Sequence, residues 1–180
     1  MGEDKYRLDW PNGPTLGEYQ RRQLAQCVRG RVWVARGRYP LTRPEELPDP
    51  PLGEGPLAGI LAAMEVSAAR RLAVLPVDVP GAAPEAFVWL GEAPVAQEGL
   101  RLVVAQAADG RLQPLVGIWP VALRAGLCAY LAQGGRRVVE FVAKQDPIVV
   151  RLPPSVQLAN LNTPEELKAY LGRIQEHPPA

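Results

Sequence analysis

The chain has 180 residues, a hydrophobic fraction of 47% and a net charge of +1 from 20 basic and 19 acidic residues. This length is typical of one domain with a full hydrophobic core. The apolar stretches are shorter than the roughly 18 residues that a membrane-spanning helix needs, and no export leader opens the sequence. The basic residues form no stripe of the kind that nucleic-acid binding requires. We therefore predict one cytoplasmic domain, residues 1–180, that binds small ligands rather than a membrane or nucleic acid.

The side chains available for catalysis restrict the mechanism. The only histidine, His177, lies in a proline-rich tail, and Cys27 and Cys128 lack partners at metal-ligand spacing. These features disfavour Ser–His–Asp or Cys–His catalysis and a zinc site. The remaining carboxylate, amide, lysine and backbone groups suit Mg²⁺ with phosphate ligands.

The first 64 residues predict two helices, a strand and a long loop. Helical apolar spacing over residues 15–28 predicts an amphipathic helix, and residues 31–35 read as a short buried strand. The proline-rich segment 40–51 is too broken for either regular element. Residues 57–64 form an Ala/Leu-rich helix that begins near Pro56.

The middle of the chain predicts a ligand-binding edge. Residues 72–77 are a continuous apolar run, which is typical of a central parallel strand, and Asp78 follows at its C-terminal end. Open α/β sheets bind ligands at that edge.

The rest of the chain alternates strands and helices. An Asp109-Gly110 turn signal predicts an antiparallel strand pair. The predicted helices are 84–90, 121–133, 136–144 and 163–176, and the predicted strands are 102–106, 112–119 and 148–152. The fold class is therefore α/β, a three-layer α/β/α arrangement with a mostly parallel sheet and a small antiparallel insertion.

Two glycine-containing motifs could contact a nucleotide. Met1-Gly2-Glu3-Asp4-Lys5 places Lys5 after a glycine turn, where it could reach a phosphate, although an exposed terminal lysine is often only solvated. Gly55-Pro56-Leu57-Ala58-Gly59 surrounds a helix start, where free N–H groups favour an anion. The alternative for this second motif is a tight contact between the helix and a strand.

Two polar motifs follow apolar segments. Asp78 at a strand end would be stabilised by a bound cation, or it caps the following turn. Asn160-Leu161-Asn162-Thr163-Pro164-Glu165-Glu166-Leu167 contains a capping box for the last helix, formed by Thr163 and Glu166. The cap does not account for Asn160 and Asn162, which would point the same way on an extended segment and could donate to a ligand.

The order of these motifs resembles molybdenum cofactor guanylyltransferase, a MobA-like nucleotidyltransferase. M-G-x-D-K, G-P-L-A-G, D-x-P, Gln113-Pro114-Leu115-Val116-Gly117, Gly135-Arg136-Arg137-Val138 and N-x-N-T-P-E-E-L follow one another from Met1 to about Leu171. The resemblance implies a Rossmann-like nucleotidyltransferase fold. It also implies transfer of GMP from GTP to the terminal phosphate of molybdopterin, with release of pyrophosphate and a requirement for Mg²⁺.

The resemblance also implies roles for individual residues. Lys5 and Asp78 would be catalytic, with Lys5 on the GTP phosphates and Asp78 holding the metal and triphosphate. Asp49 would read guanine, and the segment Gly55, Pro56, Leu57 and Gly59 would pack near the nucleotide. Asn160 and Asn162 would lie toward the molybdopterin. Partners would be GTP, molybdopterin and, beyond these, molybdoenzymes or other cofactor-biosynthesis proteins.

The chain departs from the family at three places. The L-A-G-G-x-S-R-R segment, a strand and phosphate loop, should precede M-G-x-D-K, and the asparagine after the second strand has no counterpart in residues 32–36. Gln113 stands where the family has histidine. We therefore expect weak or no activity from these 180 residues and a gain in GTP turnover when about 15 to 20 upstream residues are added. The alternatives are a sister enzyme that uses CTP or another phosphorylated acceptor, and a non-catalytic cofactor-binding relative.

Overall fold

The computed structural model describes residues 4–11, 15–82, 84–93, 101–156, 158–161 and 163–176. Its helices are η1 (Lys5–Arg7), α1 (Leu16–Cys27), α2 (Pro56–Val66), α3 (Glu85–Glu92), η2 (Val121–Leu123), α4 (Arg124–Ala132), α5 (Val138–Ala143) and α6 (Pro164–Glu176). Its strands are β1 (Val34–Gly37), β2 (Glu46–Pro48), β3 (Arg71–Val74), β4 (Val103–Gln106), β5 (Leu112–Pro120) and β6 (Ile148–Arg151). Among the described helices, none combines the length and the apolar character needed to cross a bilayer.

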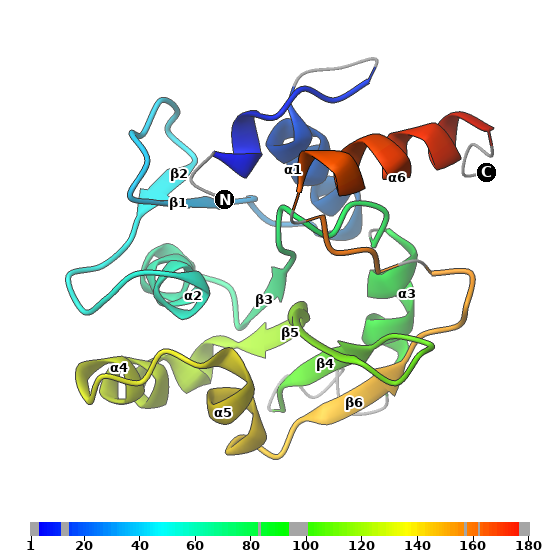
Figure 1. Ribbon diagram of the computed structural model, residues 1–180. Coiled ribbons are helices and arrows are strands. Elements are labelled where there is room, and N and C mark those ends of the chain that lie inside the picture. Colours follow the sequence, from blue (N-terminus) through cyan, green and yellow to red (C-terminus); the bar gives the residue numbers. More distant parts are fainter. Residues whose placement is uncertain are drawn as a thin grey trace.

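The strands form two sheets (Figure 1). The larger sheet has the order β3-β5-β4-β6, in which β5 pairs antiparallel with β3 and β4, and β4 pairs in parallel with β6. In the smaller sheet, β1 and β2 pair in parallel, with Val34 opposite Glu46. This smaller sheet lies against α2, since a side chain on Gly59 of α2 would meet the Cβ of Ala35 at 2.5 Å.

Helices cover both faces of the larger sheet, because alternate residues of its strands are buried on opposite sides. Val103 and Ala105 of β4 face a cluster with Phe87 and Leu90 of α3. Val104 faces the other cluster, to which α2, α4 and α5 contribute Leu57, Ile60, Leu61, Met64, Leu127, Leu131, Phe141 and Val142. The predicted three-layer α/β/α fold is thus confirmed, and Figure 1 shows α3 and the pair α4 and α5 on opposite sides of the sheet.

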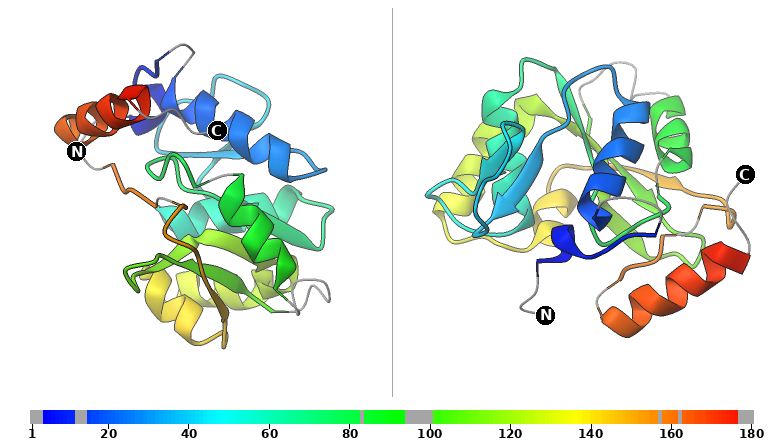
Figure 2. Two further views of the ribbon diagram at one scale, coloured as in Figure 1. Left: turned by 90° about the vertical axis from the view of Figure 1, so that its right-hand side faces the viewer. Right: turned by 90° about the horizontal axis from the view of Figure 1, so that it is seen from above.

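A third apolar cluster joins the two ends of the described chain. Trp10, Leu16 and Tyr170 are buried in it, and the rings of Trp10 and Tyr19 stack with their centroids 4.5 Å apart. The cluster packs α6 against α1 and the segment that follows η1, and these parts of the chain lie near one another in both views of Figure 2. Thr163 and Glu166 form the predicted capping box at the start of α6, each accepting a hydrogen bond from the other's backbone N–H.

Most predicted elements are confirmed within two residues, and three predictions are wrong. The strand predicted at 31–35 begins only at Val34, where pairing with β2 starts. The segment 40–51 was expected to have no regular structure, yet it contains β2. A buried carboxylate, Glu46, anchors β2 by accepting hydrogen bonds from Thr42 and Arg43 rather than by apolar alternation.

The third wrong prediction concerns the strand before Asp78. β3 is the last strand in the order of its sheet and pairs only with β5, in the antiparallel direction. It is therefore not central, and it ends at Val74 rather than at residue 77. It does run in the same direction as β4 and β6, because β3 and β4 both pair antiparallel with β5. Three strands of the larger sheet are thus parallel, and β5 is the antiparallel insertion. An apolar run indicates burial but does not give the position of the strand within its sheet. That residues 1–180 form one domain without the family's first strand and phosphate loop stays a prediction.

Candidate active site

Lys5 and Asp78 lie in direct contact although 73 positions separate them. Lys5 Nζ donates to Asp78 Oδ2 at 2.7 Å, and the two side chains are 23% and 29% exposed. Lys5 begins η1, and Asp78 lies four residues beyond the end of β3. Both groups remain reachable from solvent, so an incoming phosphate or cation could exchange partners with them.

Two helices and the segment before α6 hold the backbone on either side of Asp78. Gln20 of α1 donates from its side-chain amide to the carbonyl oxygens of Pro76 and Val79, at 3.0 and 2.9 Å. The N–H of Leu161 donates to the carbonyl oxygen of Asp78 itself at 2.7 Å. The hydroxyl of Tyr170 in α6 donates to the carbonyl oxygen of Pro80. The turn that presents the Asp78 carboxylate is therefore fixed from several directions.

Asp49 lies in a separate hollow of about 400 Å³. Its Oδ2 accepts a hydrogen bond from the N–H of Gly55 at 3.1 Å. Burial raises the pKa of Asp49 above its ordinary value, and the negative charge of Glu54 adds to the rise, while the bond from Gly55 opposes it. The volume is within the range of small-ligand sites. The lining residues are Gly37, Arg38, Asp49, Pro50, Pro51, Gly53 and Glu54.

Arg136 fastens the loop that contains this hollow. Its guanidinium donates to the carbonyl oxygens of Leu52 and Leu131, at 3.1 and 2.9 Å, and so joins the loop to the end of α4. Gly53 lies against the same group, since a Cβ at this position would be 2.9 Å from the guanidinium carbon. The hollow thus has a fixed wall on the side of Leu52 and Gly53.

The motif 55–59 begins α2 beside Asp49. Gly55 caps the helix with a φ of 97°, Pro56 is its first residue, and Leu57 is buried in the core. Gly59 faces the strand, where a Cβ would be 2.5 Å from that of Ala35 and 4.0 Å from Asp49 Oδ1. Gly59 therefore makes the tight helix–strand contact that was the alternative interpretation, while a role for this motif at a nucleotide stays a prediction.

Asn160 lies on the same side of the molecule as Asp78. Its Oδ1 is 3.5 Å from the side-chain nitrogen of the buried Gln113, and its neighbour Leu161 bonds to the Asp78 backbone. The described contacts thus bring Lys5, Asp78 and Asn160 into one region. Asn162 lies outside the described residues.

The residues present fit a Mg²⁺ ion that shares its ligands with a nucleotide. Among the described residues, no three His, Cys, Asp or Glu side chains are grouped so that they could hold a metal. Mg²⁺ in nucleotide sites usually takes only one or two carboxylates and completes its shell with phosphate oxygens and water. The partly exposed Asp78 carboxylate meets that requirement.

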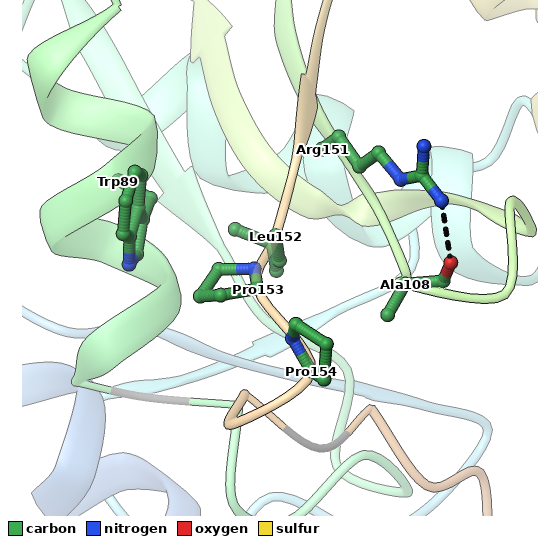
Figure 3. Close-up of a pocket in the computed structure, with 6 residues that line it drawn as sticks. All are labelled: Trp89, Ala108, Arg151, Leu152, Pro153 and Pro154. Atoms are coloured by element: carbon green, nitrogen blue, oxygen red, sulfur yellow. Dashed lines mark hydrogen bonds between the residues drawn. The ribbon is translucent and has the colours of Figure 1, made fainter.

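Another hollow, of about 330 Å³, lies between α3 and the end of β6 (Figure 3). Trp89, Leu152, Pro153 and Pro154 make most of its wall, and Arg151 donates to the carbonyl oxygen of Ala108 at 3.0 Å. Its lining contains none of the predicted site residues.

A comparison with known protein families shows to which family the chain belongs. The family described as "MobA-like NTP transferase domain" matches residues 1–148. The chain belongs to this family. The resemblance suggested by the order of motifs is therefore confirmed.

Individual relatives agree with this assignment. The molybdenum cofactor guanylyltransferase of Ectopseudomonas mendocina is 35% identical over 176 residues, which cover 93% of this chain and 83% of that one. A protein of the same name from Cereibacter sphaeroides is 40% identical over 121 residues, and the match spans only 58% of its length. The structure of molybdopterin-guanine dinucleotide biosynthesis protein A from Archaeoglobus fulgidus has a TM-score of 0.66 at 19% identity and covers 97% of this chain and 92% of that one. At that identity, the structural likeness shows the fold alone.

Sequence reasoning missed Gln20 and Arg36. Gln20 is buried four residues after Leu16, on the apolar face of α1. A polar residue on the apolar face of a predicted helix indicates that its side chain has a buried hydrogen-bond partner. Arg36 follows the apolar segment 32–35 and gave no such signal, because only the tertiary structure brings its acidic partners Asp4 and Glu46 close.

Proposed function

We propose that this member of the family transfers a guanylyl group from GTP to the terminal phosphate of molybdopterin and releases pyrophosphate. The observation that carries the proposal is the contact between Lys5 and Asp78, a lysine and a carboxylate supplied by two distant parts of the chain. The names of the relatives support this choice of substrates.

The chemistry is a displacement at the α-phosphorus of GTP. An oxygen of the acceptor phosphate forms a bond to that phosphorus, the bond to the bridging oxygen breaks, and pyrophosphate takes the electron pair. No protein nucleophile is needed, because positioning and charge stabilisation supply the catalysis. Lys5 would bind the triphosphate and offset its growing negative charge. Asp78 would hold Mg²⁺, which supplies further charge neutralisation when bound.

The remaining candidate residues would recognise the guanine base and the acceptor. Asp49 would accept hydrogen bonds from a guanine base in the hollow that Gly37 and Gly53 help to line. Asn160, with Asn162 beside it in the sequence, would face the molybdopterin. Protein partners, whether molybdoenzymes or other proteins of cofactor biosynthesis, and a cytoplasmic location belong to the same proposal.

Calorimetric titration tests the nucleotide part of the proposal. The purified chain is titrated with GTP, ATP and CTP, each with and without Mg²⁺, and the series is repeated on Asp78→Ala. We expect binding that selects GTP, depends on Mg²⁺ and is lost in the variant. Selection of CTP would instead assign the chain to a sister nucleotidyltransferase.

Release of pyrophosphate tests the chemical step. With GTP, Mg²⁺ and molybdopterin, we expect pyrophosphate only when all three are present. Cofactor binding without pyrophosphate, both in these 180 residues and after the addition of upstream residues, would identify a non-catalytic relative and overturn the proposal.

A further inference from the structure

Arg36 is a buried cation that no part of the proposed chemistry uses. Its side chain is 3% exposed and projects from β1 toward η1. Its Nη2 donates to Asp4 Oδ2 at 2.5 Å and its Nη1 to Asp4 Oδ1 at 3.3 Å, which makes a two-point ion pair. Its Nε lies 3.7 Å from an oxygen of the equally buried Glu46. A guanidinium with two points of attachment fixes the orientation of its carboxylate partner more firmly than a lysine can.

Asp4 joins this cation to the turn that carries Lys5. The carboxylate of Asp4 caps η1 by accepting a hydrogen bond from the N–H of Tyr6 at 3.2 Å. The carbonyl oxygen of Asp4 accepts a second bond from the N–H of Arg7 at 2.9 Å. The residue directly before Lys5 is therefore held both to the turn and, through Arg36, to the small sheet.

Tyr6 fixes the turn on the other side of Lys5. The guanidinium of Arg36 lies over the Tyr6 ring, 4.5 Å from its centroid. On α1, a Cβ on Gly17 would fall 1.9 Å from Cδ2 of the same ring, so only glycine allows the ring to pack there. Residues 4 and 6 are thus both anchored, and Arg36 contacts each of them.

We propose that Arg36 is a positioning residue which, through Asp4 and Tyr6, holds η1 so that Lys5 reaches Asp78. Arg36 itself touches no substrate. The positioning follows from the contacts alone, while its consequence for nucleotide binding rests on the proposed function. A merely stabilising cluster would affect unfolding but would leave the contact between Lys5 and Asp78 unchanged in the folded protein.

A zero-length carbodiimide cross-link between Lys5 and Asp78 measures the positioning without any nucleotide. The reagent joins an amine to a carboxylate in contact, and the chain has only three lysines, so mass spectrometry identifies the product readily. We expect Asp4→Asn and Arg36→Lys to lower its yield by about fivefold, because each removes the two-point charged pair. Asp4→Asn retains a side chain that can cap η1, which protects against simple unfolding.

Arg21→Met is the matched control. It also breaks a two-point pair between an arginine and a buried carboxylate, in this case Glu18. It leaves Asp4, Tyr6 and Arg36 in place, so the cross-link should form at the level of the unaltered protein. Each variant is assayed at a temperature at which its circular dichroism spectrum is that of the folded protein.

A double-mutant cycle connects the positioning with nucleotide binding. Asp4→Asn should weaken Mg²⁺-dependent GTP binding by about tenfold, as expected for the loss of one well-placed charged contact. In a Lys5→Met background, the same substitution should change affinity by less than about twofold, because the contact it positions is already absent.

The two measurements separate the two proposals. An unchanged cross-link in Asp4→Asn and Arg36→Lys overturns the positioning role, whatever the nucleotide data show. A lost cross-link in a protein that binds no nucleotide upholds the positioning role and removes the proposed function. A lost cross-link with an effect on affinity that is equally large in the Lys5→Met background would show that Arg36 does not act through Lys5, and the inference would fail.

Discussion

The carboxylates of Asp78 and Asp49 have different surroundings. Asp78 is paired with a lysine at 2.7 Å, and the surrounding backbone is held by α1, α6 and the segment before α6. Asp49 is hydrogen-bonded to one backbone N–H, and burial raises its pKa. A ligand at the first site has to separate an ion pair, whereas a ligand at the second supplies hydrogen bonds to a carboxylate that is short of them.

This difference suggests a division of labour. Charge pairing suits a site that exchanges one charged partner for another, as phosphate and Mg²⁺ binding require. A partly desolvated carboxylate in a hollow suits the recognition of neutral N–H donors on a base. Substitutions at the pair should therefore change the affinity for all nucleotides, and substitutions in the hollow should change the preference among them.

Asp78→Asn should have the largest effect. The substitution keeps the volume of the side chain but removes its charge, so affinity for GTP in the presence of Mg²⁺ should fall by about a hundredfold and the dependence on Mg²⁺ should disappear. Titration of GTP, ATP and CTP measures this. Asp109→Asn, in the turn between β4 and β5, is the control and should change nothing. A changed base preference in Asp78→Asn would contradict the proposed division.

Acid should weaken the contact that Glu18 makes between α1 and the loop before β2. Hydrogen bonds from Arg21 lower the pKa of Glu18 from 4.5 to about 2. Burial opposes this shift, and the positive charges of Arg21 and Arg43 add to it. Because the folded pKa is depressed, the stabilisation is complete above pH 4.5 and is lost as the pH falls from there toward 2. It corresponds to about 3 kcal/mol at most.

Urea unfolding of Glu18→Gln measures this contribution. At pH 7 the variant should be less stable than the unaltered chain by up to about 3 kcal/mol, and the gap should narrow below pH 4. Glu65→Gln, an exposed position near the end of α2, is the control. A gap of the same size at pH 7 and pH 3 would show that ionisation of Glu18 is not its source.

Gln20→Met should disturb only the Asp78 side of the comparison. Methionine matches the length of glutamine but donates no hydrogen bond to Pro76 or Val79, so the turn with Asp78 should loosen. We expect affinity for GTP with Mg²⁺ to fall by about tenfold, with an unchanged preference for GTP over ATP. Titration with both nucleotides measures the two quantities, and a loss confined to GTP would place Gln20 with the base site instead.

Asp49→Asn should change the preference among nucleotides rather than the affinity for all of them. Asparagine replaces one acceptor oxygen by a donor, so the preference for GTP over ATP should fall by about tenfold while affinity for ATP stays constant. In the unaltered chain, GTP affinity should rise with pH through the raised pKa of Asp49, since only the ionised carboxyl accepts from both donors of a base. The variant should lack this pH dependence, and its persistence there would assign it to another group.

Local signals singled out several of the candidate site residues. A glycine turn pointed to Lys5, a polar residue after an apolar run to Asp78, and a cap that left two asparagines unexplained to Asn160. Each signal depends on a few neighbouring residues. The same kind of evidence placed α1, α2 and the antiparallel β4–β5 pair, because periodicity, caps and turn residues act over short distances.

Other features gave no local signal. Glu46 anchors β2 through hydrogen bonds and a nearby arginine, so the proline-rich segment around it resembled a loop. The apolar run before Asp78 resembled a central strand, although β3 is the last strand in the order of its sheet and pairs only with β5. Strand direction and neighbours depend on parts of the chain that a local window does not contain.

The sequence by itself determined most of the helices and strands and indicated which side chains could serve a nucleotide, because helix caps, turn residues and apolar periodicity are properties of adjacent residues. The tertiary structure decided that Lys5 meets Asp78, that Gln20 supports the turn of Asp78, and that Arg36 lies between Asp4 and Tyr6. Each of these contacts joins residues that are 30 or more positions apart in the sequence. Their geometry exists only after the layers have packed.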